Sequence, residues 1–364
     1  FNMFSLRAFN TFGIEAEARQ FVEISSIDQY VALRTSGEYA HLPHLFLGGG
    51  SNVLLTQAQE ALVVKISIPG ISVVKEDADF VWLKGGAGVV WDEFVQYAVN
   101  HGWSGLENLS LIPGTVGAAP MQNIGAYGAE IKDTFESLEA LNLQTLELEV
   151  FDAKACAFGY RESFFKRAGK GQYLISSVTF KLSKKPSVKT SYGAIQEVLA
   201  TKGITQPSIR DVADAVIEIR KSKLPDPKEI GNSGSFFKNP TVSASEASRL
   251  MAEFPGIPNY PVEGSTEVKF PAGWFIEKAG WKGFRRGDAG VHAKQALVLV
   301  NYGDATGAEI LALSEEIKQS IKDTFGVYLE TEVNIFEAGD IIVLSTGQRH
   351  RLVGLNDWGV IAEI

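Results

Sequence analysis

Two long glycine-rich segments constrain this chain more than any other feature. The first, LGGGSNVLL, spans residues 47–55, and the second, IPGTVGAAPMQNIGAYG, spans residues 112–128. Glycine adopts positive φ at little steric cost and lets backbone N–H groups approach an anion closely. Each segment adjoins apolar, strand-like sequence, and the second also carries polar and aromatic residues. Together they predict a site for a large ligand with phosphates and a flat ring, and the alternative is that both are tight turns.

Neither segment is a standard nucleotide motif. The first lacks the lysine of G-x-x-x-x-G-K-[ST], which argues against a P-loop. No G-x-G-x-x-G opens a helix after a strand, which argues against a Rossmann dinucleotide site. Residues 231–235, GNSGS, nearly spell the hydrolase motif G-x-S-x-G, but the fifth residue is serine. The common phosphate-site and esterase interpretations therefore fail.

The size and composition of the chain are those of a globular protein. With 364 residues, 45% hydrophobic and 21% charged, it is long enough for two or three domains with real cores. The net charge is −9 and no basic stripe accompanies aromatic residues, so we expect no nucleic-acid partner. No apolar run reaches about 18 residues and no signal-peptide pattern opens the chain, which predicts a cytoplasmic protein without a membrane partner. We expect Phe1–Asn2 to be a tag remnant and Met3 the natural start.

Cysteine and histidine usage argues against a metal centre. Cys156 is the only cysteine, which excludes an internal disulfide and a cysteine cluster. Its apolar neighbours predict a buried, inert thiol. The five histidines form no H-E-x-x-H motif, and Pro43 between His41 and His44 argues against a helical ligand pair. We expect no metal.

Hydrophobic periodicity predicts a mixture of strands and helices. Strands are expected over 61–66, 81–84, 173–182 and 327–336, with one or two antiparallel strands over 141–150. Helices are expected from Asp92 to a stop at Gly102, over 209–223, and over 306–325 with a stop at Gly326. Residues 340–364 are expected to form short strands with turns. This order predicts an α+β fold with mixed sheets in at least two domains.

Four further segments are informative because of the order in which they follow one another along the chain. They are GYRES at 159–163, KLPDP at 223–227, GSFFKNP at 234–240 and LETEV at 329–333. Taken singly, each could be a surface ion pair, a turn or the solvent face of a strand. Together with the glycine-rich segments they resemble the UDP-N-acetylenolpyruvoylglucosamine reductases, flavoenzymes that complete UDP-N-acetylmuramate for peptidoglycan. The resemblance runs from about Phe9 to about Phe336, and the usual proline between the two glutamates is Thr331 here.

The resemblance implies a domain organisation. It predicts an α+β protein with an FAD-binding region of the vanillyl-alcohol-oxidase type over 1–188, in two subdomains of about 1–70 and 71–188. A smaller α+β substrate-binding domain is expected over 189–335. The C-terminal tail, 336–364, is expected to pack back on the N-terminal region.

The resemblance also implies the cofactor. FAD should be bound without a covalent bond, because neither glycine-rich segment offers a histidine or cysteine for attachment, and NADPH should be the co-substrate. The residues assigned to FAD are Gly48, Gly49, Gly50, Ser51, Asn52, Pro113, Gly114, Thr115, Gly117, Ala118, Gln122, Asn123, Ile124, Gly125, Ala126, Tyr127, Gly128 and Arg220.

The family pattern assigns catalytic roles to three side chains. Arg161 would hold the substrate carboxylate and stabilise the enolate-like charge that follows hydride addition at C3. Glu332 would assist at the same carboxylate by hydrogen bonding, and Ser235 would deliver a proton to C2 as the general acid. The residues assigned to substrate binding are Tyr160, Tyr192, Lys223, Asn239 and Gln295.

Tyr192 belongs to a tyrosine loop found in one of the family's two subtypes. The family precedent also implies a monomer or weak dimer in the bacterial cytoplasm. Two alternatives stay open from the residues alone. One is another FAD-dependent oxidase or dehydrogenase on the same fold, acting on an alcohol or hydroxy acid. The other is a nucleotide-sugar binding module without catalysis.

Overall fold

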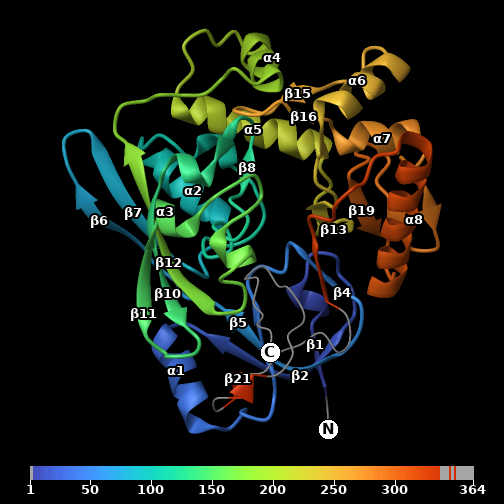
Figure 1. The fold of residues 1–364 in the computed structure, drawn as a ribbon. Coiled ribbons are helices and arrows are strands. Elements are labelled where there is room, and N and C mark those ends of the chain that lie inside the picture. The colour runs from blue at the N-terminus through green and yellow to red at the C-terminus, as the bar shows by residue number, and fades with distance from the viewer. Residues whose placement is uncertain (1–2, 337–343, 346–347, 350–364) are drawn as a thin grey trace.

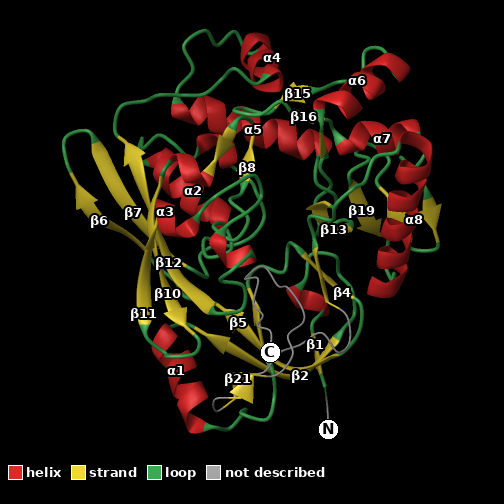
Figure 2. Ribbon diagram, viewed as in Figure 1, coloured by secondary structure: helices red, strands yellow, loops and turns green. Residues whose placement is uncertain are grey.

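Three sheets of four or five strands organise the part of the chain that is described. The computed structural model describes residues 3–336, 344–345 and 348–349. The N-terminal sheet, a five-stranded antiparallel sheet and a C-terminal sheet surround the middle of the molecule, with helices on their outer faces (Figures 1 and 2). No described helix has the length and apolar character to span a membrane.

The N-terminal sheet presents the first glycine-rich segment. Its strand order is β1-β2-β5-β3, and β2 and β3 pair with β5 in parallel. Buried side chains cover both faces of β5, which accounts for the mainly apolar sequence of the strand predicted over 61–66, where Lys65 is the exception. The glycines follow β3 directly, and β4 then pairs in parallel with β20. The bounds are β1 Phe4–Ser5, β2 Glu17–Ile24, α1 Ile27–Ser36, β3 His44–Leu47, β4 Val53–Leu55, β5 Gln59–Ile66 and β20 Asn334–Phe336.

The five-stranded sheet is antiparallel throughout, in the order β11-β10-β12-β7-β6. Helix α2 packs on it through fully buried Trp91 and Phe94, whose rings meet Phe180 of β12. The predicted strands at 81–84 and 173–182 and the helix near Asp92 are confirmed. The bounds are β6 Ile71–Glu76, β7 Phe80–Gly86, α2 Trp91–Asn100, β10 Phe135–Asn142, β11 Leu148–Asp152, α3 Ala153–Cys156 and β12 Tyr173–Ser183.

The C-terminal sheet, in the order β13-β19-β18-β17, packs against α7 and α8. Helix α8 begins at the cap Thr306 and ends at Gly326, whose φ of 69° matches the stop predicted from the sequence. A small sheet, β14-β16-β15, lies beside it. The bounds are β13 Gly231–Ser235, β14 Thr241–Val242, α6 Ala244–Glu253, β15 Tyr260–Pro261, β16 Val268–Lys269, α7 Ala272–Lys278, β17 Arg285–Arg286, β18 Ala289–Val291, β19 Val298–Asn301 and α8 Gly307–Phe325.

Helix α5 (Ile209–Lys223) lies across the top of the molecule in Figure 1 and touches α2 and the 3-10 helix η2 (Glu107–Leu109). On its other side it packs against α4 (Gly193–Thr201). Part of the region predicted as a substrate domain over 189–335 therefore contacts the predicted FAD-binding region. The division at residue 188 stays a prediction.

Two segments differ from the predicted elements. Only Asn334–Phe336 is a strand in the segment 327–336, because Thr331 forms an isolated bridge to Phe237 rather than part of a ladder. The segment 141–150 spans the end of β10 and the start of β11, joined by a turn. The predictions for 336–364 fall outside the described residues, except that Phe336 pairs with Leu55 and that β21 (Leu344–Ser345) pairs with β22 (Gln348–Arg349).

Candidate active site

The two glycine-rich segments lie in direct contact, and the contact leaves no room for side chains. A Cβ added to Gly49 would lie 3.2 Å from the Cα of Gly114. At Gly50, where φ is 63°, a Cβ would lie 1.9 Å from the carbonyl oxygen of Phe9. Gly49 therefore lets the backbones of the two segments touch, and Gly50 lets the first segment pass against the backbone of Phe9.

A pocket opens where the segments meet. Its wall consists mainly of backbone, small side chains and neutral amides. Many of the residues predicted to bind FAD line it together with four others. The lining residues are Ser51, Asn52, Pro113, Gly114, Thr115, Ala118, Ala119, Met121, Gln122, Ile124, Lys166 and Asn334.

Two buried polar atoms near the second segment lack a hydrogen-bond partner within the described structure. One is the hydroxyl of Thr115 in the pocket wall, and the other is Nε of Arg220. Arg220 also hydrogen bonds with the Tyr127 hydroxyl, and burial lowers the pKa of its guanidinium. Buried polar groups are normally paired, so these atoms are suited to a polar ligand. Glycine-lined backbone and an incompletely paired guanidinium fit a dinucleotide such as FAD.

Other residues predicted for the cofactor have partners within the protein. The side chain of Asn123 donates to Glu130 at 2.9 Å and to the carbonyl of Gly159 at 3.0 Å. Gly117 N–H donates to the backbone of Ala87. In the first segment, the carbonyl of Gly48 accepts a hydrogen bond from Lys65. In the second, Gly125 and Ala126 form β8, which pairs with β9 (Ala129–Glu130) directly after Gly128. These contacts shape the second segment, and the structure does not place these residues in the pocket lining.

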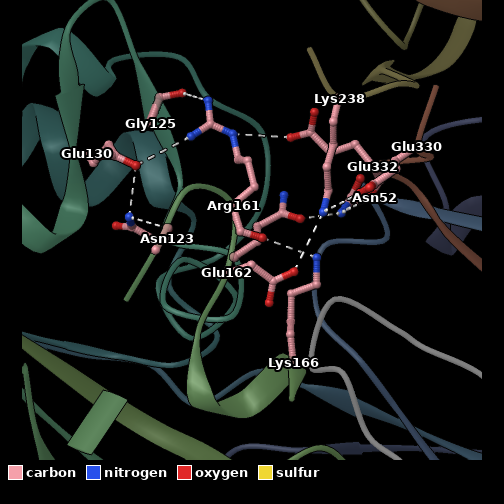
Figure 3. Close-up of polar contacts among 12 residues, drawn as sticks. Asn52, Asn123, Gly125, Glu130, Arg161, Glu162, Lys166, Lys238, Glu330 and Glu332 are labelled. Carbon is pink, nitrogen blue, oxygen red and sulfur yellow. Dashed lines mark hydrogen bonds and ion pairs between the residues drawn. The ribbon is translucent and has the colours of Figure 1, made fainter. Parts of the chain in front are cut away.

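A cluster of charged side chains adjoins the pocket (Figure 3). Arg161 Nε lies 3.4 Å from Glu332 Oε1, and its Nη2 donates to the carbonyl of Gly125 at 2.8 Å. Asn52 joins the cluster to the pocket, since its Nδ2 donates to Gln122 at 3.2 Å and to the carbonyl of Glu332 at 3.4 Å. Residues predicted for catalysis and for cofactor binding therefore meet.

Backbone strain marks the same region. Asn123, Tyr127 and Arg161 have φ values of 45°, 50° and 51°, in the left-handed region that non-glycine residues seldom adopt. Such strain persists only where surrounding contacts hold it, and it concentrates at functional sites. Here it directs the Arg161 side chain toward Gly125 and Glu332.

The electrostatics of the cluster favour a neutral Glu332. Burial raises the pKa of its carboxyl, and the nearby Arg161, Lys166 and Lys238 oppose that rise only in part. Burial and the neighbouring Lys238 lower the pKa of the Lys166 ammonium. Both groups are therefore pushed toward their uncharged forms, as is common at active sites.

Ser235 lies at the end of β13, beside the segment that carries Glu332. Backbone bonds join the two segments: Glu332 N–H donates to Phe236 at 2.8 Å, and Lys238 N–H donates to Glu330 at 2.8 Å. The Ser235 side chain is half-buried and makes no hydrogen bond among the described residues. Its hydroxyl is therefore available to a ligand.

Residues predicted for the substrate extend away from this cluster. Lys269 Nζ lies 3.4 Å from the centre of the Tyr160 ring, and the Tyr160 hydroxyl bonds to the backbone of Asn239. The Asn239 side chain accepts from the N–H of Ala272 at the start of α7. Gln295 also lies at this end of α7, because a Cβ on Gly273 would come within 3.9 Å of its Oε1.

The remaining two predicted substrate residues lie near α4 and α5. Tyr192 is half-exposed, and its ring meets that of Tyr127 edge-on at 5.3 Å. Lys223 is exposed at the end of α5, one turn beyond Arg220. Tyr127 thus links the second glycine-rich segment to Tyr192 and, through Arg220, to α5.

Sequence reasoning missed several charged residues of the cluster, including Glu130, Lys166 and Lys238. Lys238 Nζ lies 3.6 Å from Glu162 and 3.7 Å from Glu330. Lys238 follows a Phe-Phe pair within GSFFKNP, and Lys166 follows one directly after GYRES, so a lysine after two aromatics was a usable signal. The prediction for Cys156 is confirmed, since it is fully buried and burial raises the pKa of its thiol to about 12. Within the described ranges, no group of three or more histidine, cysteine, aspartate or glutamate side chains is arranged to hold a metal.

Comparison with known proteins decides the family. A protein named UDP-N-acetylenolpyruvoylglucosamine reductase from Flavobacterium johnsoniae is 52% identical over 333 residues, covering 91% of this chain and 98% of its own. One of the same name from Burkholderia ambifaria is 50% identical over 329 residues, covering 90% of this chain and 94% of its own. The chain belongs to the UDP-N-acetylenolpyruvoylglucosamine reductase family.

Two family models divide the reductase chain. One described as an FAD binding domain matches residues 18–146, and one described as the UDP-N-acetylenolpyruvoylglucosamine reductase C-terminal domain matches residues 226–336. The crystal structure of the reductase from Thermus caldophilus has a TM-score of 0.64 at 24% identity, covering 92% of this chain and 100% of its own. The predicted α+β fold with an FAD-binding domain is confirmed.

Proposed function

We propose that Arg161, Glu332 and Ser235 form the reaction centre of this reductase. The chain is an FAD-dependent oxidoreductase of peptidoglycan precursor synthesis. With NADPH as the electron donor, it reduces the enolpyruvyl group of UDP-N-acetylglucosamine enolpyruvate and forms UDP-N-acetylmuramate. The observation that carries the proposed roles is the 3.4 Å contact between Arg161 and Glu332 beside the pocket between the glycine-rich segments.

The pocket would hold FAD through Ser51, Asn52, Thr115 and Gln122, with Arg220 next to the second segment. When bound, FAD reduced by NADPH supplies the hydride that adds to C3 of the enolpyruvyl group. The described residues that line the pocket include no His or Cys, so the binding should be non-covalent. The charged cluster and Ser235 then act on the substrate at the mouth of this pocket.

Arg161 orients and stabilises the substrate carboxylate. Its guanidinium is fixed by the Gly125 carbonyl and by the carboxylates of Glu332 and Glu130, with Glu130 Oε2 3.9 Å from Nη1. Negative charge builds at C2 and on the carboxylate as C3 gains its hydrogen. A guanidinium held in place before the reaction stabilises this charge without reorganising.

Glu332 assists as a hydrogen-bond donor at the same carboxylate. Burial raises the pKa of its carboxyl, which favours the protonated form that can donate. An ionised Glu332 would instead repel the carboxylate. Its pairing with Arg161 keeps the carboxyl in place in either form.

Ser235 delivers the proton to C2. Its hydroxyl has no partner within the described residues, and its backbone is next to the Glu332 segment. A serine is a weak acid, so the positive charges of Arg161 and Lys238 support the loss of its proton. Protonation at C2 completes the reduction.

The UDP part of the substrate would extend over Tyr160, Tyr192, Lys223, Asn239 and Gln295. Lys223 suits the diphosphate because its exposed ammonium is a compact positive charge. Tyr192 can close over the sugar nucleotide from the start of α4. We also propose that the protein works in the bacterial cytoplasm, as a monomer or weak dimer, without nucleic acid or a membrane.

The roles are tested by separating the two half-reactions in the Arg161→Met variant. NADPH should still bleach the bound flavin, because that step needs no substrate carboxylate. Reoxidation by the enolpyruvyl sugar should slow by about 10²–10³-fold, as for removal of other preorganised donors. The control is Arg167→Met, whose side chain in the same segment is exposed. Equal rates in wild type and Arg161→Met would remove Arg161 from the reaction centre.

A further inference from the structure

Lys166 is fixed at the boundary between the pocket and the charged cluster. It ends the 3-10 helix η4 (Phe164–Lys166), which is capped by Ser163. The Ser163 hydroxyl donates to the carbonyl of Met121 at 2.6 Å and accepts from the N–H of Phe165 at 3.1 Å. Phe165 is fully buried. This helix is therefore anchored directly on the second glycine-rich segment.

Lys166 is the charged residue of the pocket lining, whose other described members are all neutral. Its Nζ makes one long hydrogen bond, 3.5 Å to the carbonyl of Arg161, and no ion pair among the described residues. The neighbouring cations do form ion pairs: Arg161 contacts Glu332, and Lys238 contacts Glu162 and Glu330. Figure 3 shows Lys166 and Lys238 approaching the cluster from opposite sides.

A partly buried ammonium without a direct ion pair costs free energy. Burial and Lys238 lower the pKa of the Lys166 ammonium, and the carboxyl groups of Glu162 and Glu332 oppose this only in part. A negative charge on a ligand in the pocket would raise the pKa of this ammonium again. The structure thus places an incompletely compensated positive charge in the pocket lining, where a negative charge on a ligand would stabilise it.

We infer that Lys166 stabilises the negative charge that the flavin ring of FAD acquires when it takes up two electrons. This inference rests on the proposed binding of FAD between the glycine-rich segments. The proposed function brings the substrate carboxylate to Arg161, so the reacting end of bound FAD would be on that side of the pocket. Lys166 is at that boundary, 3.5 Å from the Arg161 carbonyl.

Two other anions are less well matched to this position. Backbone N–H groups of the glycine-rich segments already offer partners for the FAD diphosphate. Arg161, whose guanidinium also contacts Glu332, already offers a partner for the substrate carboxylate. The two-electron reduced ring gains charge at its N1–C2=O edge, and a nearby cation favours that form over the oxidised one.

The test is the midpoint potential of bound FAD in Lys166→Met. Affinity for reduced FAD should fall at least about tenfold more than affinity for oxidised FAD, which lowers the two-electron potential by about 30 mV. Lys166→Arg should keep the wild-type potential. Lys238→Met is the matched control, because it removes a neighbouring ammonium that does not line the pocket, and its shift should be smaller.

The pH dependence gives a second readout that a purely structural role would not change. Uptake of one proton with two electrons lowers the potential by about 30 mV per pH unit, and uptake of two lowers it by about 59 mV. Wild type should show the smaller slope near neutral pH. Lys166→Met should move toward the larger slope, because the ring then takes a proton in place of the ammonium.

Other results would overturn the inference. Equal losses of affinity for oxidised and reduced FAD would assign Lys166 to the diphosphate. An unchanged potential with weaker binding of the enolpyruvyl sugar would assign it to the substrate carboxylate. Should Lys166→Met not fold, Lys166→Gln carries the same measurements. A wild-type protein that binds no FAD would instead refute the proposed function.

Discussion

The pocket between the glycine-rich segments is lined mainly by backbone and neutral side chains. The adjoining cluster is charged instead: Arg161 contacts Glu332, and Lys238 is close enough to influence the pKa of the same carboxyl. The first region depends on shape, because a Cβ at Gly49 would crowd the backbone of Gly114 and one at Gly50 would collide with that of Phe9. The second depends on charge, because burial shifts the pKa of its ionisable groups. Substitutions should therefore act through steric fit in one region and through protonation and pairing in the other.

The largest expected effect is a steric one in the first glycine-rich segment, where the backbone passes against Phe9. Gly50→Ala should abolish FAD binding and destabilise the protein by well over about 2 kcal/mol, since the left-handed backbone alone costs an alanine about 1–2 kcal/mol. The added Cβ would also collide with the Phe9 carbonyl at 1.9 Å. Urea unfolding and fluorescence titration with FAD measure both effects.

Gly128→Ala is the matched control for the steric argument. Gly128 has a φ of 82°, but nothing lies within 4 Å of an added Cβ. It should cost about 1–2 kcal/mol through backbone strain alone. If both variants lose stability and FAD equally, the close approach at Gly50 does not matter.

The next effect concerns His44, which begins the strand leading into the first glycine-rich segment. Burial lowers the pKa of this histidine from 6.5 to about 4, and its Nδ1 lies 3.1 Å from the Tyr30 hydroxyl. Below pH 6.5 the unfolded chain binds a proton that the native protein does not. Stability should therefore fall by about 3 kcal/mol between pH 6.5 and pH 4.

Unfolding free energies measured across this pH range would check that loss. The His44→Gln variant should lose this part of the pH dependence while keeping the rest. A variant whose stability varies with pH as in wild type would show that His44 does not contribute. The result would also show whether the stability of the pocket region, which otherwise depends mainly on steric fit, depends on the charge of one histidine.

A smaller effect is expected from Glu332→Gln in the charged cluster. The folded-state pKa of Glu332 is raised, so its stabilising contribution is present at low pH and is lost as the pH rises through that pKa. The glutamine variant should be more stable than wild type at neutral pH by on the order of 1 kcal/mol. The difference should shrink toward acidic pH. A variant less stable at neutral pH would mean that the Arg161 ion pair outweighs burial.

The smallest effect is expected from Tyr192→Phe, outside both regions. Removing one hydroxyl hydrogen bond costs about 0.5–1.5 kcal/mol, so affinity for the UDP-sugar should fall about three- to tenfold. Reduction of the flavin by NADPH should keep its rate. Tyr260→Phe, at another exposed tyrosine, is the control. Unchanged affinity would remove Tyr192 from the substrate site.

Much of the fold could be predicted because its signals are local. The helix 209–223 matches α5 to the residue, since a Ser208–Asp211 capping box starts it and apolar periodicity fixes its inner face. The segment 327–336 was wrong as a single strand, because its backbone partners lie in Phe236–Lys238, far away in the sequence. Local alternation does not report such partners.

The site was less accessible to sequence reasoning. Arg161 and Glu332 were connected through the order of motifs typical of the family, since nothing local indicates that residues so far apart form an ion pair. Lys166 was missed because its role depends on Ser163 anchoring η4 to Met121. Its lack of an ion pair is visible only when all its neighbours are placed.

The central claim, that Ser235 is the proton donor beside Arg161 and Glu332, is tested most directly by stopped-flow measurement of both half-reactions in Ser235→Ala. NADPH should reduce the flavin at the wild-type rate, because no proton is delivered to C2 in that step. Reoxidation by the enolpyruvyl sugar should slow by roughly 10²–10⁴-fold, as expected for a lost general acid. Reoxidation near the wild-type rate would contradict the account, and equal slowing of both half-reactions would reduce Ser235 to a structural role.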